Sequence, residues 1–282
     1  MVSEKGYDYF AADMNWYGGY IERTLAEVIR ARVEGVLISH IQEAFAEEHV
    51  AELRRAGIPV VSVNGESRPT VPLICDDVQA AFQELTRHLL DRKHRRIIQL
   101  VSSYSHLNQD RVRTMNHRTI GFRQAVESRG RWQSMWEEDF FNTPHRWERR
   151  GSQGITILQD NLLYDQVDRP VYKFCKRLFA SGELPDAIVC SNDMYAIEAI
   201  LAGMEHGIRV PEDLAITGYD NDRLGAFPAF SITTAEQDTE RLCSTAVDLL
   251  MQQIADPNTE AKSHTFDSKI IIRNSSALKK RK

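Results

Sequence analysis

Short apolar runs alternate along the chain with longer stretches in which apolar residues recur at helical spacing. The short runs are typical of buried strands, and the strands that they predict are Tyr7–Ala12, Gly35–Ser39, Pro59–Val63, Leu73–Cys75, Ile97–Val101, Ile155–Leu158, Ala187–Cys190, Ala215–Gly218, Ile232–Ala235 and Phe266–Ile272. The helices predicted between them are Ile21–Arg32, Glu43–Ala56, Gln79–Asp91, Arg118–Ser128, Val171–Ser181, Met194–Gly207 and Thr239–Ile254. This alternation indicates parallel β-α-β units. The strands outnumber those of an ordinary sheet, so we expect two sheets.

Residues 129–154 interrupt the alternation. The stretch carries three of the four tryptophans and lacks a clear apolar period, so we expect a long irregular insertion. Such insertions are usually functional or disordered, and the aromatic content favours a functional one. The acidic run Glu137-Glu138-Asp139 inside it is predicted to be a solvated loop.

Composition excludes several classes of protein. With 282 residues, 42% hydrophobic and 27% charged, the chain has the ordinary mix of a globular protein. Its net charge of −5 argues against a broad basic surface for nucleic acid. No apolar run approaches the roughly 18 residues of a membrane span, and the start MVSEKGYDYF is not a secretory signal.

Cofactor, metal and catalytic motifs are absent from the sequence. The cysteines form no C-x-x-C pair, and we expect Cys75, Cys175, Cys190 and Cys243 to be buried, reduced thiols, as suits a cytoplasmic protein. The nine histidines show no metal-binding spacing. Phosphate-binding glycine loops and the G-x-S-x-G nucleophile turn are also missing. We therefore predict no cofactor, no metal and no enzyme activity.

Polar residues follow several of the predicted strands directly. In doubly wound folds, ligands bind outside the carboxyl ends of the strands. Polar groups that converge there from several strands form a cleft for a small molecule. The runs in question are Asp76-Asp77, Ser191-Asn192-Asp193, Tyr219-Asp220-Asn221-Asp222 and Glu236-Gln237-Asp238.

One stretch, from Pro185 to Asp222, carries a specific combination of motifs. In order, they are Asn192-Asp193-Met194-Tyr195-Ala196, Gly207-Ile208-Arg209-Val210-Pro211-Glu212-Asp213 and Gly218-Tyr219-Asp220-Asn221. This combination resembles the core of the lactose/galactose-repressor (LacI/GalR) family of transcription regulators. Tyr195 stands where that family often has methionine.

Other segments resemble the same family in the same order along nearly the whole chain. They are Arg32-Val33-Glu34-Gly35-Val36-Leu37-Ile38, Gly57-Ile58-Pro59-Val60-Val61, Asp76-Asp77, His88-Leu89-Leu90 with His94-Arg95-Arg96-Ile97, Arg118-Thr119-Ile120-Gly121-Phe122, Ser231-Ile232-Thr233-Thr234 with Gln237, and Ile272-Arg273-Asn274-Ser275-Ser276. Two departures stand out. Tyr7–Ala12 resembles the second strand of the family's sensor domain, so its first strand and helix and the helix-turn-helix headpiece are missing, and either the chain is a fragment or its start lies upstream. The family pattern is also lost between Gly130 and Gly154.

The resemblance implies an α/β fold of two doubly wound parallel-sheet lobes of the periplasmic-binding-protein type, joined by crossover strands. We expect residues 1–95 with 238–262 to form the N-terminal lobe. Residues 96–237 with 263–278 would form the C-terminal lobe, and residues 279–282 a basic, solvated tail.

The resemblance also implies a set of effector-binding residues. Arg118 would offer a planar fork of donors, Asp220 would accept two hydroxyls, and Asn192 would both donate and accept. The remaining candidates are Asp77 with Asp76 from the other lobe, Gln237 from the crossover, and Trp147 and Tyr164 as stacking aromatics.

Structural roles remain open for several of these residues. Arg118 could be a surface ion pair, and Asp76 could cap the helix that follows it. We expect Asp193 to cap the helix from Met194, and Asp213 to belong to the turn after Pro211.

The function implied is effector sensing in a cytoplasmic, dimeric regulator. A small molecule, which we expect to be a carbohydrate although purine-type effectors also occur, would drive lobe closure and so modulate DNA binding through a headpiece absent from this sequence. No membrane partner is expected. The alternatives are a solute-binding protein of a sugar transporter and an enzyme that uses Asp220 and Arg118.

Overall fold

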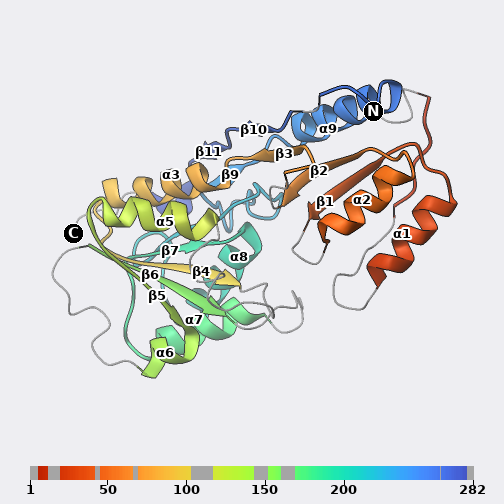
Figure 1. Cartoon of the computed structure of the whole chain (residues 1–282). Helices are drawn as coiled ribbons and strands as arrows, with labels where there is room; N and C mark the ends of the chain where they lie inside the picture. Colours follow the sequence, from red (N-terminus) through yellow and green to blue (C-terminus); the bar gives the residue numbers. More distant parts are fainter. Residues whose placement is uncertain are drawn as a thin grey trace. The chain divides into compact units, whose positions relative to one another are not determined.

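The computed structural model describes residues 6–11, 20–41, 45–65, 69–102, 117–142, 152–159, 169–260 and 262–277 (Figure 1). The chain forms two units. Unit 1 comprises Met1–Asp77 and Asp238–Phe266, and unit 2 comprises Val78–Gln237 and Asp267–Lys282. Each unit holds a parallel sheet with helices on both faces, which confirms the predicted fold class.

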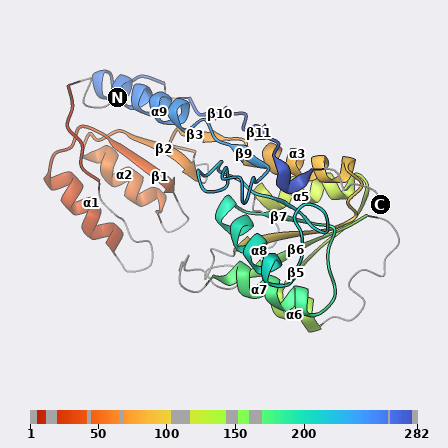
Figure 2. The same cartoon turned by 180° about the vertical axis from the view of Figure 1, so that it is seen from behind.

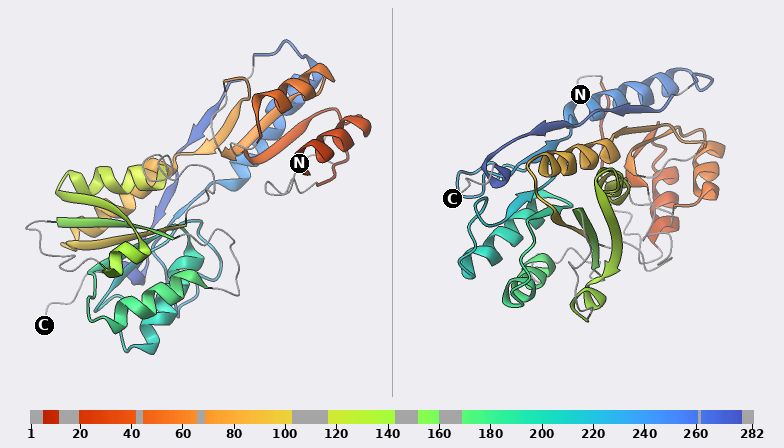
Figure 3. Two further views of the ribbon diagram at one scale, coloured as in Figure 1. Left: turned by 60° about the horizontal axis from the view of Figure 1, so that its bottom comes forward. Right: turned by 90° about the vertical axis from the view of Figure 1, so that its left-hand side faces the viewer.

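Unit 1 is built on a four-stranded parallel sheet in the order β1-β2-β3-β10. Its elements are α1 (Tyr20–Arg30), β1 (Val36–Ile41), α2 (Glu47–Arg55), β2 (Val60–Gly65), β3 (Leu73–Asp76), α9 (Thr239–Ala255) and β10 (His264–Phe266). Successive residues of β2 point to opposite faces. Val60 packs with α1 and α2, whereas Val61 packs with α9, so the helices cover both faces of the sheet (Figure 3).

Unit 2 is built on a five-stranded parallel sheet in the order β5-β6-β4-β7-β8. Its elements are α3 (Val78–Asp91), β4 (Arg96–Ser102), α5 (His117–Glu127), β5 (Gly130–Trp136), α6 (Glu137–Asn142), β6 (Ser152–Gln159), α7 (Pro170–Ala180), β7 (Ala187–Cys190), α8 (Asp193–Glu205), β8 (Ala215–Thr217), β9 (Thr234–Glu236), β11 (Lys269–Ile271) and a 3₁₀ turn, η2 (Asn274–Ser276). Strands β9 and β11 pair antiparallel in a separate two-stranded sheet.

The sheet of unit 2 is buried on both faces. Ile97 packs with Phe82 of α3 and Phe122 of α5, whereas its neighbour Ile98 packs with Phe174 of α7 and the residues of α8. Figures 1 and 2 show α3 and α5 on one face of the sheet and α7 and α8 on the other. Burial on both faces explains why these strands are continuous apolar runs in the sequence.

Helix α3 packs on α5 within unit 2, and the two axes come close. A Cβ on Gly121 would lie 2.1 Å from the backbone oxygen of Gln79, so only glycine fits this crossing. The division between the units therefore falls after Asp77, whereas the sequence placed it after residue 95. The predicted strand Phe266–Ile272 also differs from the structure. Its residues divide between β10 of unit 1 and β11 of unit 2, because the chain passes between the units at 266/267.

Three further predictions are wrong. No strand forms over residues 7–11, the described part of Tyr7–Ala12. Residues 129–154 are not an irregular insertion, because β5 and α6 occupy residues 130–142 and β6 begins at Ser152. The acidic run Glu137-Glu138-Asp139 is the first turn of α6 rather than a loop, where carboxylates complement the positive end of the helix dipole.

The cysteines are only partly as expected. Cys175 and Cys190 are buried free thiols, whereas Cys75 and Cys243 are partly exposed. Burial raises the pKa of the Cys175 and Cys190 thiols above the ordinary value. Within the described ranges, no helix is long and apolar enough to cross a membrane.

Candidate functional site

Tyr219, two residues after β8, contacts the starts of two helices of unit 2. Its ring is fully buried, and the guanidinium carbon of Arg118 lies 5.4 Å from the ring centroid. Its carbonyl accepts a hydrogen bond from the backbone nitrogen of Asp193 at 2.8 Å. The start of α5, the start of α8 and the loop after β8 therefore meet at one tyrosine.

Arg118 occupies the first turn of α5, and its guanidinium also lies 5.8 Å from the centre of the Phe82 ring. A cation over two aromatic faces is held in place by electrostatic attraction to both rings. The side chain is partly buried.

A buried polar chain fixes the backbone beneath Arg118. Trp132 Nε1 donates to Thr156 Oγ1 at 2.9 Å, Thr156 Oγ1 donates to Gln99 Oε1 at 3.0 Å, and Gln99 Nε2 donates to the Arg118 carbonyl at 3.0 Å. Gln99 and Thr156 are completely buried. Because Gln99 and Thr156 are buried and hydrogen-bonded in series, this network supports the backbone at Arg118.

Asn192, and not Asp193, caps α8. Asn192 has the extended backbone of an N-cap residue, and its Oδ1 accepts from Tyr195 N at 2.8 Å. The prediction that Asp193 caps a helix from Met194 is therefore wrong, because the helix begins one residue earlier. Asp193 is buried, and its Oδ2 accepts from the backbone nitrogen of Asp222 at 2.7 Å.

The buried carboxyl of Asp193 has a raised pKa. Burial is the main cause and raises the pKa to about 7, against the hydrogen bonds from Thr234 and Asp222 N, which lower it. A Cβ on Gly218 would lie 2.1 Å from Asp193 Oδ1. The glycine of the G-Y-D motif therefore leaves room for this carboxyl.

The loop after Tyr219 has an uncommon backbone. Asp220 has φ of 100° and Asn221 has φ of 54°, both in the left-handed region. For residues other than glycine, such conformations cost about 1–3 kcal/mol each and cluster at ligand sites. Asp220 is exposed, its backbone nitrogen donates to Ala235 O at 2.9 Å, and its Oδ1 accepts from Gln237 Nε2 at 3.3 Å.

Four of the eight predicted residues lie in unit 2. Arg118 lies beside Tyr219, Asp220 follows Tyr219 and binds Gln237, and Asn192 precedes Asp193, whose backbone binds Tyr219. Sequence reasoning missed Tyr219, although it belongs to the G-Y-D motif that was recognised.

The other four candidates have different positions. Asp76 is the last residue of β3 in unit 1 and is buried, and Asp77, which follows it, donates from its backbone nitrogen to Phe266 O at 2.8 Å. Trp147 and Tyr164 lie outside the described residues. Asp213 lies in the turn after Pro211, as predicted, and its carboxylate binds both Nε and Nη2 of Arg209 at 2.8 Å.

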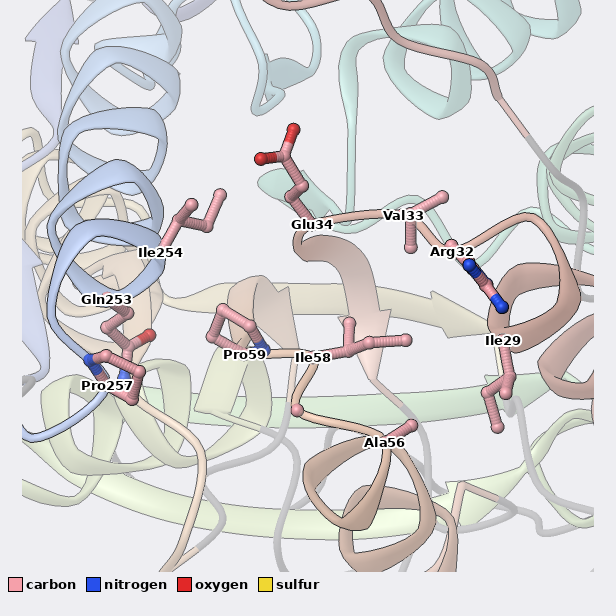
Figure 4. Close-up of a pocket in the computed structure, with 11 residues that line it drawn as sticks. Ile29, Arg32, Val33, Glu34, Ala56, Ile58, Pro59, Gln253, Ile254 and Pro257 are labelled. Atoms are coloured by element: carbon pink, nitrogen blue, oxygen red, sulfur yellow. The ribbon is translucent and has the colours of Figure 1, made fainter.

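Unit 1 contains a separate cavity of about 630 Å³ at the amino ends of its strands. Figure 4 shows Ile58 and Pro59 between Gln253 on one side and Arg32 on the other. Its lining includes Arg32, Glu34 and Gln253 beside aliphatic side chains. None of the eight candidates belongs to it, so the cavity is distinct from the candidate site. Over the described ranges, no three His, Cys, Asp or Glu side chains gather as metal ligands would.

Comparison with protein families decides the classification. Residues 86–276 match the model of the periplasmic binding protein-like domain, and residues 2–140 match that of periplasmic binding proteins and the sugar binding domain of the LacI family. The chain is a LacI-family periplasmic-binding-protein-like domain. This confirms the resemblance seen in the strand-end motifs.

The relatives of this chain include several HTH-type transcriptional regulators. A regulator from Streptomyces limosus, described as an uncharacterized HTH-type transcriptional regulator in the aml 5' region, is 26% identical over 269 residues, which cover 92% of this chain and 68% of the relative. The HTH-type transcriptional repressor PurR of Photobacterium profundum is 26% identical over 257 residues, which cover 90% of this chain and 66% of the relative. The chain thus spans about two thirds of the length of these relatives.

Solved structures of transcription regulators share the fold. A regulator from Enterococcus faecium with bound ribose has a TM-score of 0.69 at 22% identity, covering 92% of this chain and 85% of its own. The regulator GntR from Chromobacterium violaceum has a TM-score of 0.73 at 23% identity, covering 98% and 90% respectively.

Proposed function

We propose that the chain is the effector-sensing domain of a LacI-type transcriptional regulator and that its effector is a carbohydrate. The observation that carries the proposal is the meeting at Tyr219 of Arg118, of the Asp220 loop and of the start of α8, which Asn192 caps. Structural neighbours were solved with ribose, D-xylulofuranose and cellobiose, which supports a sugar.

Each proposed group suits a ligand with several hydroxyls. The exposed Asp220 carboxylate can accept from two neighbouring hydroxyls, and Gln237, already bonded to it, can donate and accept beside it. Arg118 only donates, so it would bind a hydroxyl or an anionic oxygen. Asp76 and Asp77 would contribute acceptors from unit 1, and Trp147 and Tyr164 stay as the proposed stacking aromatics.

The proposed mechanism is ligand-dependent closure of the two lobes. A ligand that binds the closed state more tightly shifts the population toward it. In the regulator, that change would alter the spacing of two DNA-binding headpieces in a homodimer. The proposal places the chain in the cytoplasm, where it reaches chromosomal DNA.

Exposed apolar side chains on unit 2 support the dimer. Leu224 is 48% exposed and Phe227 is 56% exposed, and they lie three residues apart in the turn after the Asp220 loop, where Phe227 N donates to Leu224 O. Large exposed apolar side chains that lie close together are typical of surfaces that meet another protein.

In the described core, one serine–histidine pair lies at hydrogen-bonding distance, and its geometry does not favour the enzyme alternative. His88 Nε2 and Ser276 Oγ are 2.7 Å apart, and Arg92 Nη1 lies 2.9 Å from His88 Nδ1. Because arginine can only donate, Nδ1 must accept and Nε2 must carry the hydrogen. His88 therefore donates to Ser276 and cannot activate it as a nucleophile. The solute-binding alternative is decided by the DNA next to the coding region, which would encode a headpiece or a signal peptide.

A thermal-shift screen tests the proposal. D-Ribose, cellobiose and hypoxanthine are titrated into the purified chain, and a binder at about 100 times its Kd adds about 2.7 kcal/mol to the free energy of unfolding. Arg118→Gln and Asp220→Asn should lose that shift, whereas the surface control Arg209→Gln should keep it. A ligand whose thermal shift is unchanged in both variants contradicts the proposed site. If hypoxanthine alone shifts the wild type, the effector is a purine rather than a carbohydrate.

A further inference from the structure

The chain passes between the units at 237/238 and at 266/267. The loop that carries Asp220 is hydrogen-bonded to residues beside both of these passages. Glu236 and Gln237 directly precede the passage at 237/238, and Arg273 follows the one at 266/267. Gln237 binds Asp220, while Glu236 and Arg273 bind its neighbour Asn221.

Arg273 spans two acceptors from two different segments. Its Nη1 donates to Ile232 O at 2.8 Å, and its Nη2 donates to Asn221 Oδ1 at 2.6 Å. The two Nη donors of one planar guanidinium hold both acceptors, Ile232 O and Asn221 Oδ1, at a fixed separation. The single ammonium of lysine cannot do this.

Asn221 uses both ends of its amide for this framework. Its Oδ1 accepts from Arg273, and its Nδ2 donates to Glu236 Oε1 at 2.7 Å. The backbone of Asn221 is left-handed, with φ of 54°, a conformation that needs support from its surroundings. Because Asp220 is the preceding residue, the orientation of its carboxylate depends on this support.

The segment that carries Arg273 is itself firmly held. Ser275 Oγ donates to Ile216 O at 2.6 Å and accepts from Thr233 N at 2.8 Å. Ser276 Oγ donates to Thr233 Oγ1 at 2.6 Å. Both serines are buried, so Arg273 is a fixed point for the loop.

We infer that Arg273 is a positioning residue for the candidate site. Through Asn221 it holds the Asp220 loop in the backbone conformation that binds the effector, and it ties that loop to the segments that join the units. This inference rests on the proposed function only in assigning Asp220 to the effector.

Amide hydrogen exchange, followed by mass spectrometry on the full chain without ligand, tests the inference. In Arg273→Gln we expect the amides of residues 220–222 to exchange about tenfold faster than in the wild type, since a charged hydrogen bond is lost. Arg209→Gln, which removes an exposed ion pair with Asp213, is the matched control and should leave these amides unchanged. Arg273→Lys keeps the charge without the fork, and it serves if Arg273→Gln does not fold.

A double-substitution cycle separates positioning from general stability. Glycine adopts the left-handed region freely, so in an Asn221→Gly background Arg273→Gln should change exchange at residues 220–222 by less than about twofold. The loss of the Ile232 bond should lower Tm equally in both backgrounds. Unchanged exchange in Arg273→Gln, or an equal effect in both backgrounds, overturns the inference. A wild type that binds none of the sugars while the exchange behaves as expected contradicts the proposed function alone.

Discussion

The carboxyl of Asp193 occupies the space that a side chain on Gly218 would need. A Cβ at position 218 would lie 2.1 Å from Asp193 Oδ1 and 3.0 Å from Asp193 Cα. The start of α8 and the end of β8 approach this closely because the backbone of Asp193 also donates to Tyr219 O. The floor of the candidate site is therefore close-packed around one buried acid.

Gly218→Ala should destabilise the chain and weaken effector binding. The Asp193 carboxyl is buried and its Oδ2 is hydrogen-bonded to Asp222 N, so overpacking should cost about 1–3 kcal/mol. Gly203→Ala is the matched control, because the nearest atom to its added Cβ is 3.6 Å away and alanine favours a helix. Urea unfolding measures both. Equal stability of the two variants would contradict the described packing.

Gly121→Ala should separate α3 from α5. Its Cβ would meet the backbone oxygen of Gln79 at 2.1 Å, and a backbone atom cannot rotate away. We expect a loss of about 1–3 kcal/mol in the free energy of unfolding. Because Arg118 lies on α5 over Phe82 of α3, separating the two helices should also displace Arg118 and lower the affinity for the effector. A crystal structure showing unchanged helix spacing would contradict this explanation.

Asp193 should make the chain less stable as pH rises. Its pKa is about 7 in the folded chain, against an ordinary 3.8, so the folded state keeps a proton that the unfolded state has released. The free energy of unfolding should therefore fall between about pH 4 and pH 7, by about 4 kcal/mol. Asp193→Asn removes this fall, which urea unfolding across that range measures.

His88 should act in the opposite direction. Burial and the neighbouring Arg92 lower its pKa to about 4, from 6.5, so the unfolded chain binds the extra proton. The free energy of unfolding should rise between about pH 4 and pH 6.5, by about 3 kcal/mol. The two groups offset each other in the wild type. Asp193→Asn should therefore show a rising profile and His88→Gln a falling one, and two parallel profiles would contradict these assignments.

Gln99→Leu should disturb Arg118 without touching any ligand. It removes the acceptor of the buried Thr156 hydroxyl and the side-chain donor to the Arg118 carbonyl, and a buried group left without its partner costs about 1–3 kcal/mol. Effector affinity should fall with stability, and the Trp132 fluorescence should change because its indole binds Thr156. Thr156→Val tests the same hydrogen-bond network at its central residue. Normal effector affinity in both variants would show that this network does not support the site.

The alternation of apolar runs and amphipathic stretches was sufficient to predict the parallel β-α-β units. The period of a strand or helix depends on residues close together in sequence, and a strand buried on both faces such as Ala187–Cys190 shows it clearly. The same local logic placed Asn192 and Asp220 at strand ends, where parallel sheets bind ligands.

Only the tertiary structure revealed the features that depend on distant contacts. Strand β5 was missed because an edge strand exposes polar residues and loses the apolar pattern. Helix α3 belongs to unit 2 because of its contact with Gly121 of α5, about 40 residues away. Arg273 reaches Asn221 across 52 positions. Local pattern determined which elements form, whereas the packing of residues remote in sequence decided which unit each element joins and which side chains support the site.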